Sequence, residues 1–159
     1  SDLVRYGDCI AKISVAPVSP ELTRLIDAPL DYDGNPNALR DAVIAFFKQH
    51  GGVWEVRVQL CTDIETMPVE DASVVWPEDK SPYVAVARLT VPMQDAWAQP
   101  TVERVNEGLS FSPWHALAAH QPLGGIMRAR KPVYRMSADF RASHGSPVAE
   151  PKTREDIPA

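Results

Sequence analysis

The sequence predicts a fold of the α+β class, in which part of an antiparallel β-barrel has helices to one side. Three segments alternate apolar and polar residues in the way of half-buried strands, at 9–16, 54–61 and 83–91. Short helical patterns lie between these strands, and the longest helical stretch, 123–141, follows the last of them. Long strands with short helices between them are the basis of this prediction.

Length and composition predict one folded domain. The chain has 159 residues, of which 45% are hydrophobic and 23% are charged, as in ordinary globular proteins. Its formal net charge of −5 argues against partners such as nucleic acid or an anionic membrane surface. The sequence holds neither a membrane-spanning apolar run nor a secretion signal, so we expect a cytoplasmic protein. Its two cysteines, Cys9 and Cys61, are expected to be buried thiols.

The first strand pattern covers 9–16, and Pro17 is expected to end it. One of its faces is mixed, and the other is wholly apolar, with Cys9, Ala11, Ile13 and Val15.

The segment 31–35 resembles part of a calcium-binding loop. However, its glycine is misplaced, and Ala42 stands where the bidentate glutamate is needed, so a turn is the better interpretation.

A core-facing helix is predicted next, with Asn35 as its cap, Pro36 at its first position and Gly51 as its stop. The clearest strand pattern follows at 54–61.

The acidic residues of 63–73 could in principle hold a metal ion. Because no histidine lies among them, a solvated linker is the better interpretation.

The part of the chain after the strand at 83–91 changes to helical turns, which we expect Pro100 and Pro113 to break. His115 and His120 are five residues apart, about 140° around a helix, so a regular helix cannot bring both to one metal ion. The sequence also lacks the motifs of serine hydrolases, zinc proteases and phosphate-binding loops.

The helical stretch 123–141 contains the candidate functional residues. Arg130, Tyr134 and Arg141 would lie within about 60° of one stripe at 100° per residue. A guanidinium one turn from a phenol favours the deprotonated phenolate by direct attraction. A phenolate on a helix is a hard, anionic metal ligand.

The start of this helix is predicted from its glycines and its proline. Gly124 and Gly125 allow the main chain to enter the helix tightly. Pro132 is compatible with two arrangements: the helix begins near Ala129, or it kinks just before Tyr134.

The same residues resemble a known family. Phe111-Ser112-Pro113, followed by Arg130-x-x-x-Tyr134 and Arg141, resembles the proximal segment of the haem catalases. Val75-Trp76-Pro77 and the strand at 54–59 fall where catalases have similar sequences. The similarity extends over roughly residues 5 to 142 and is closest to the short, catalase-related haem peroxidases of bacteria.

The resemblance implies that residues 1–142 are the C-terminal, proximal half of a catalase-like haem domain, and that 143–159 form a loose tail. The fold would be the second half of the antiparallel barrel with flanking helices and a C-terminal proximal haem helix. Haem b, with its iron, would be the cofactor. The resemblance implies that Tyr134 is the axial iron ligand and a catalytic residue, and that Arg130 is catalytic because it stabilises the phenolate. It also implies that Arg141 binds a haem propionate. The implied haem contacts are Phe111, Ile126 and Ala129.

The implied function is that of a haem-dependent catalase or peroxidase acting on hydrogen peroxide or organic hydroperoxides. No segment of the chain resembles the catalase segment that carries the distal histidine. We therefore expect a partner, a separate or nicked N-terminal half, and a higher homo-oligomer of the assembled unit. Ser14 replaces a histidine that catalases place beside the proximal arginine. Two alternatives are a haem enzyme that rearranges hydroperoxides or oxidises a small organic molecule, and a non-catalytic haem-binding scaffold half.

Overall fold

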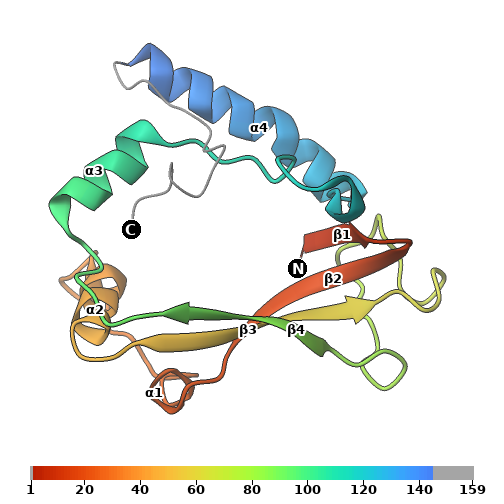
Figure 1. Ribbon diagram of the computed structural model, residues 1–159, viewed down its shortest axis with the longest axis horizontal. Coiled ribbons are helices and arrows are strands. Elements are labelled where there is room, and N and C mark those ends of the chain that lie inside the picture. Colours follow the sequence, from red (N-terminus) through yellow and green to blue (C-terminus); the bar gives the residue numbers. More distant parts are fainter. Residues whose placement is uncertain (1, 145–159) are drawn as a thin grey trace. The chain divides into compact units, whose positions relative to one another are not determined.

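The computed structural model of the protein describes residues 2–144. Their elements are β1 (Asp2–Tyr6), β2 (Cys9–Pro17), α1 (Pro20–Thr23), α2 (Ala38–Phe47), β3 (Gly52–Leu60), β4 (Val84–Val91), α3 (Gln99–Gly108), a 3₁₀ turn η1 (Ala118–His120) and α4 (Gly124–Ser143) (Figure 1). Two compact units are formed, which are described separately below. The first holds 2–14, 58–84 and 99–144, and the second holds 15–57 and 85–98.

The strands form a four-stranded antiparallel sheet in the order β1-β2-β3-β4. The predicted strands at 9–16, 54–61 and 83–91 are confirmed as β2, β3 and β4, with ends that differ by at most two residues. In this sheet β1 and β4 are the edge strands. The mixed α and β composition and the antiparallel pairing agree with the predicted fold class.

Strand β1 lies before the first strand that the sequence patterns predicted, at 9–16. It pairs with β2 from Asp2 opposite Ile13 to Tyr6 opposite Cys9, so the turn between them has two residues. Gly7 begins this turn with a φ of 62°, a conformation that glycine adopts without strain. On its other side, the β1 backbone bonds to the segment 119–123, with Arg5 N–H donating to the Gln121 carbonyl at 2.8 Å.

Both faces of β2 contribute buried residues to the first unit, because Ala11, on the predicted apolar face, is fully buried, and the mixed face is covered as well. Leu3, Met67 and Trp76 form a buried cluster against which Ile10 packs, and Lys12 on the same side of β2 is also buried. This side is buried because the loop after β3 folds back over it. Cys9, expected to be buried, is exposed at the end of the hairpin, and Cys61 is half-buried. Pro17 is the last residue of the strand, not the residue after it.

Helix α2 also differs from its prediction. It begins at Ala38 because the Asn35 side chain accepts a bond from the Asn37 N–H at 2.9 Å and holds a turn before the helix. Leu39 and Val43, expected in the core, are 58% and 40% exposed. They line an apolar groove of about 510 Å³ in the second unit.

Two prolines thought to interrupt helices lie within them. Pro100 is the second residue of α3, where a proline is tolerated because the first turn lacks backbone acceptors for its N–H groups. Pro132 lies inside α4, which is one continuous helix from Gly124 to Ser143. The predicted helix start near Ala129 is therefore wrong. Residues 145–159, most of the predicted tail, lie outside the described part.

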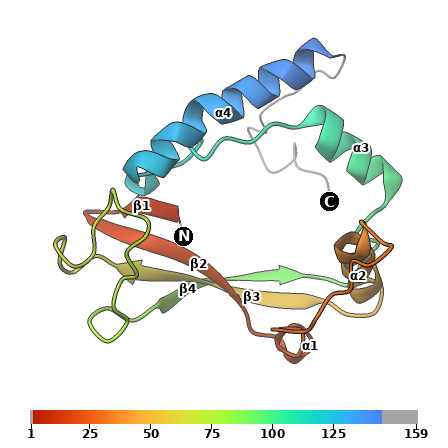
Figure 2. The same ribbon diagram turned by 180° about the vertical axis from the view of Figure 1, so that it is seen from behind.

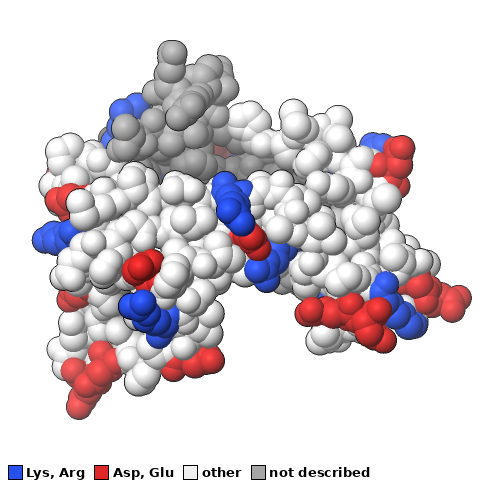
Figure 3. Space-filling model, turned by 60° about the horizontal axis from the view of Figure 1, so that its bottom comes forward, with Lys and Arg blue, Asp and Glu red and all other residues white. Residues whose placement is uncertain are grey.

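Charged side chains of both signs lie next to one another on the face drawn in Figure 3. No helix among residues 2–144 combines the length and the apolar character that crossing a membrane requires.

Candidate functional site

Helix α4 places a guanidinium directly on a phenol. Arg130 donates a hydrogen bond from Nη2 to the phenol oxygen of Tyr134 at 2.7 Å, and the centre of its guanidinium lies 5.2 Å from the centre of the Tyr134 ring. The other end of the guanidinium donates from Nη1 to the sulfur of Met127 at 3.4 Å. The predicted one-turn relationship between cation and phenol is therefore present as a direct contact.

The first turn of α4 is fixed by a close approach to the loop after β3. Gly124 has a φ of 87°, and a Cβ at this position would lie 2.8 Å from the Val69 carbonyl oxygen. One turn on, Arg128 forms a two-bond ion pair with the Glu70 carboxylate at 2.8 and 2.7 Å. This guanidinium holds the pKa of Glu70 below its usual value, mainly by hydrogen bonding. Together these contacts set where α4 begins and how it is rotated.

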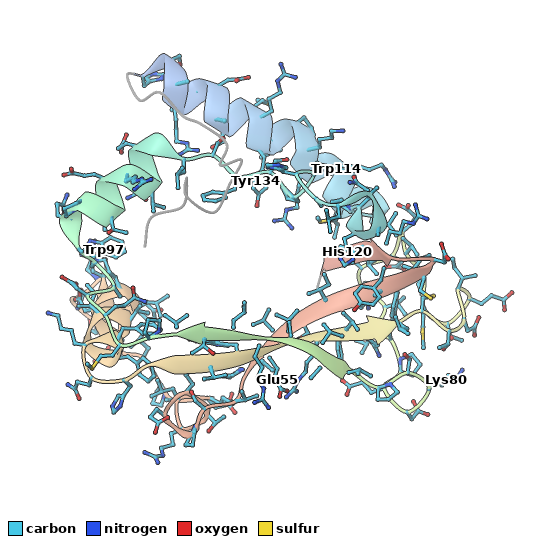
Figure 4. All side chains as sticks on the ribbon, viewed as in Figure 1. Glu55, Lys80, Trp97, Trp114, His120 and Tyr134 are labelled. Carbon is cyan, nitrogen blue, oxygen red and sulfur yellow. The ribbon has the colours of Figure 1, made fainter. Side chains whose placement is uncertain are left out.

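The segment that leads into α4 lies along the helix, as Figures 1 and 2 both show. Trp114 holds it there: its indole Nε1 donates to the Met127 carbonyl at 3.3 Å. The Lys131 ammonium lies 4.4 Å from the centre of a Trp114 ring, a cation–π contact from the same helix. Figure 4 shows Trp114 and Tyr134 on this side of α4.

Phe111, from this segment, and Tyr134, from α4, both line two open hollows. One hollow, of about 270 Å³, also has Ser110, Ser112, Lys131, Arg135 and Ala138 in its walls. The other, of about 260 Å³, is completed by Val133, Ser137 and Arg141. The second hollow thus combines aromatic and aliphatic walls with one guanidinium and one phenol.

The structure brings most of the predicted site residues together. Phe111, Tyr134 and Arg141 share the second hollow, and Arg130 reaches it through its hydrogen bond to Tyr134. Arg141 also donates from Nη1 to the Asn106 carbonyl at 2.9 Å.

Ile126 and Ala129 are placed elsewhere. Ile126 is 58% exposed and lines a different, smaller hollow beside Leu3, and Ala129 is exposed outside both hollows of Tyr134. The sequence analysis also missed three residues of the site, namely Trp114, Val133 and Ser137. Helical spacing could have identified the last two, because Val133, Ser137 and Arg141 follow one another at steps of four residues and so share one face of α4.

The described residues contain no group of three histidine, cysteine or carboxylate side chains that could hold a metal ion. The Tyr134 phenol oxygen is therefore the metal-ligand candidate that remains from the sequence analysis. Its surroundings fit a flat, largely apolar cofactor, because Phe111 and Val133 line the hollow and Arg130 provides positive charge at the oxygen. Arg141 adds a donor for an acidic substituent.

Comparisons with known proteins address the fold. Neither a protein-family model nor a curated protein sequence matches this chain. Among solved structures, the crystal structure of a fungal catalase is similar, with a TM-score of 0.62 and 15% identical residues over 88% of this chain. This chain spans 29% of the length of that catalase chain. At this identity the similarity shows the fold alone, so the expected catalase-like fold is confirmed, and the bacterial subgroup stays a prediction.

Proposed function

We propose that this chain provides the tyrosinate side of a haem site in a catalase- or peroxidase-type oxidoreductase. The observation that carries the proposal is the 2.7 Å hydrogen bond from Arg130 to Tyr134 at the edge of the hollow shared with Phe111 and Arg141. The catalase-like fold supports it. In this proposal residues 1–142 act as the proximal half of a haem domain, and the substrates are hydrogen peroxide or organic hydroperoxides.

Four residues of the hollow, together with Arg130, have proposed roles in holding haem b. The phenolate oxygen of Tyr134 binds the iron, and Arg130 stabilises the negative charge on that oxygen. Phe111 and Val133 contact the macrocycle through apolar surface, and Arg141 binds a propionate with the guanidinium donors that Asn106 does not use. When bound, haem b supplies the redox-active iron for peroxide reduction.

A second polypeptide is part of the proposal, because apolar side chains on two elements face solvent. On α4, Ile126, Met136 and Phe140 are 58%, 69% and 63% exposed, and Met136 and Phe140 are about one helical turn apart. On the edge strand β4, Val84, Val86 and Leu89 are 56%, 44% and 49% exposed. Such surfaces favour a protein partner. We propose that the N-terminal half of the domain covers them and carries the distal histidine.

We further propose that the assembled unit is cytoplasmic and forms a higher homo-oligomer. The cysteines of the described residues are both free thiols, as in proteins of a reducing compartment.

Substitution of the phenol tests the ligand assignment. Tyr134→Phe removes the oxygen and keeps the ring, so the haem-containing protein should lose the absorption bands of tyrosinate-bound iron. Tyr32→Phe, on an exposed tyrosine of the second unit, is the matched control and should keep them. An unchanged spectrum in Tyr134→Phe would falsify the assignment.

Intact mass spectrometry of the native preparation tests the cofactor and the partner. We expect haem and a second polypeptide to co-purify with this chain. A preparation that contains the chain without either of them contradicts the proposal. A distal histidine on the partner, with oxygen release from hydrogen peroxide, then distinguishes a catalase from a hydroperoxide-rearranging enzyme or a non-catalytic scaffold.

A further inference from the structure

A further hollow in the first unit contains a buried amine and is independent of the proposed haem site. It has a volume of about 170 Å³ and shares no lining residue with the two hollows of Tyr134. Its walls are formed by Lys12, Gln59, Ala72, Val74, Val75, Trp76, Glu78 and Tyr83.

Lys12 is an unusual residue for this position. It lies on the central part of β2 and is only 7% exposed. Its Nζ donates to the Val74 carbonyl at 3.1 Å and lies 4.5 Å from the centre of a Trp76 ring, so both neighbours that hold the amine also line the hollow. None of the ion pairs among the described residues includes Lys12.

Burial without a carboxylate partner makes this amine a better nucleophile than an ordinary lysine. Burial lowers the pKa of Lys12, so a larger fraction of it is neutral near pH 7 than of a lysine in water. Neutral lysines in desolvated pockets attack carbonyl carbons. The other ionisable groups of the hollow are Glu78 and Tyr83. Burial, and to a smaller extent the charge of Glu78, raises the pKa of Tyr83, so its phenol stays protonated and can donate a hydrogen bond.

The walls of the hollow also define what it can hold. A water molecule occupies about 30 Å³ of liquid, so the hollow has room for a molecule of roughly five heavy atoms. The carboxylate of Glu78 disfavours an anionic compound in the same space. A neutral molecule with one polar atom therefore fits better than a carboxylic acid.

We propose that the hollow beside Lys12 is a binding site for a small neutral aldehyde or ketone, which Lys12 captures as an imine. The Nζ lone pair forms a bond to the carbonyl carbon, the carbonyl electron pair moves to the oxygen, and a proton passes from the nitrogen to this oxygen. The resulting carbinolamine then loses this hydroxyl, together with a proton from nitrogen, as water. The step is reversible and involves no oxidant or reductant.

The test is selective labelling of the whole chain. The protein is treated near pH 7 with limiting butanal and cyanoborohydride, which reduces the imine to a stable alkylamine, and labelled lysines are identified by peptide mass spectrometry. Lys12 should be labelled several-fold faster than Lys48 or Lys80, which are both exposed. Labelling of Lys12 at the rate of these lysines, or slower, overturns the proposal.

Two controls separate the site from ordinary amine chemistry. In urea the preference for Lys12 should disappear, because unfolding gives every lysine the same surroundings. The bulky 1-naphthaldehyde should show no preference even with the folded protein, and a preference for Lys12 with it would contradict the size limit. The variant Lys12→Arg keeps a cation beside Trp76 and should remove the fast label. A fast label that persists in this variant refutes the assignment to Lys12.

Discussion

Nη2 of Arg130 lies 2.7 Å from the phenol oxygen of Tyr134, four residues further along α4. Because both side chains start from one helix, their separation depends on helical geometry and on rotamers, and not on how distant parts of the chain fold. Arg141 belongs to the same helix, so among the predicted residues of this hollow only Phe111 is brought to the pair by the tertiary structure.

The role of the guanidinium is tested by Arg130→Leu. A hydrogen bond to a charged group contributes about 1.5–3 kcal/mol, so haem should dissociate roughly tenfold faster or more from this variant. The control is Arg24→Leu, which removes an exposed guanidinium of the second unit that lines neither hollow of Tyr134. Haem transfer to an acceptor protein, followed by absorbance, measures both rates. Equal rates in Arg130→Leu and in the unsubstituted protein would contradict the role given to Arg130.

The contact of Trp114 is tested by Trp114→Phe. This change removes the indole donor to the Met127 carbonyl and keeps a ring beside Lys131. We expect the free energy of unfolding to fall by about 0.5–1.5 kcal/mol. Trp97→Phe is the control, because it keeps a ring beside Arg40 at an exposed position of the second unit. Urea unfolding followed by circular dichroism should rank Trp114→Phe as the less stable variant, and the reverse order would refute the contact.

The start of α4 is tested by Gly124→Ala. The alanine would adopt a φ of 87° with its Cβ 2.8 Å from the Val69 carbonyl oxygen, so we expect a loss of about 1–3 kcal/mol of stability. Gly108→Ala at the end of α3 is the control, because a Cβ there meets no atom within 4 Å. Thermal unfolding of both variants measures the difference. Equal midpoints would show that the close approach at Gly124 is absent in solution.

The pair of Glu70 and Arg128 predicts a pH dependence. Because the folded protein lowers the pKa of Glu70, the pair stabilises the fold at pH values above the ordinary carboxyl pKa, about 4.3. This contribution is lost as the pH falls through the lower pKa of the folded state. Glu70→Gln should therefore be less stable than the unsubstituted protein at neutral pH, and the two should converge as the pH falls below the pKa of Glu70 in the folded state.

Urea midpoints at several pH values check this expectation. Glu65→Gln, in the same loop, is the control and should follow the unsubstituted protein throughout. Because both side chains of the pair are about 60% exposed, the difference at neutral pH should be small and should shrink in high salt. A difference that persists unchanged at low pH would mean that Glu70 acts through packing and not through its charge.

Strands and helix spacing were the part of the molecule that could be predicted. Alternation identified β3 and β4, because a half-buried strand repeats every two residues. Helical periodicity placed Arg130 and Tyr134 one turn apart, and they are in contact. Local patterns could not predict that Lys12, on the mixed face of β2, is buried as well, since that depends on where the loop carrying Met67 and Trp76 folds back.

The sequence by itself determined the α+β class, the two long strands and the pairing of a guanidinium with a phenol on one helix, because these follow from repeats of two and 3.6 residues. The tertiary structure alone decided that Phe111 lies opposite Tyr134, that Gly124 meets Val69, and that Lys12 is buried. These relationships join residues far apart in the chain, and their free energy comes from burial and long-range hydrogen bonds, which leave no periodic signal in the sequence.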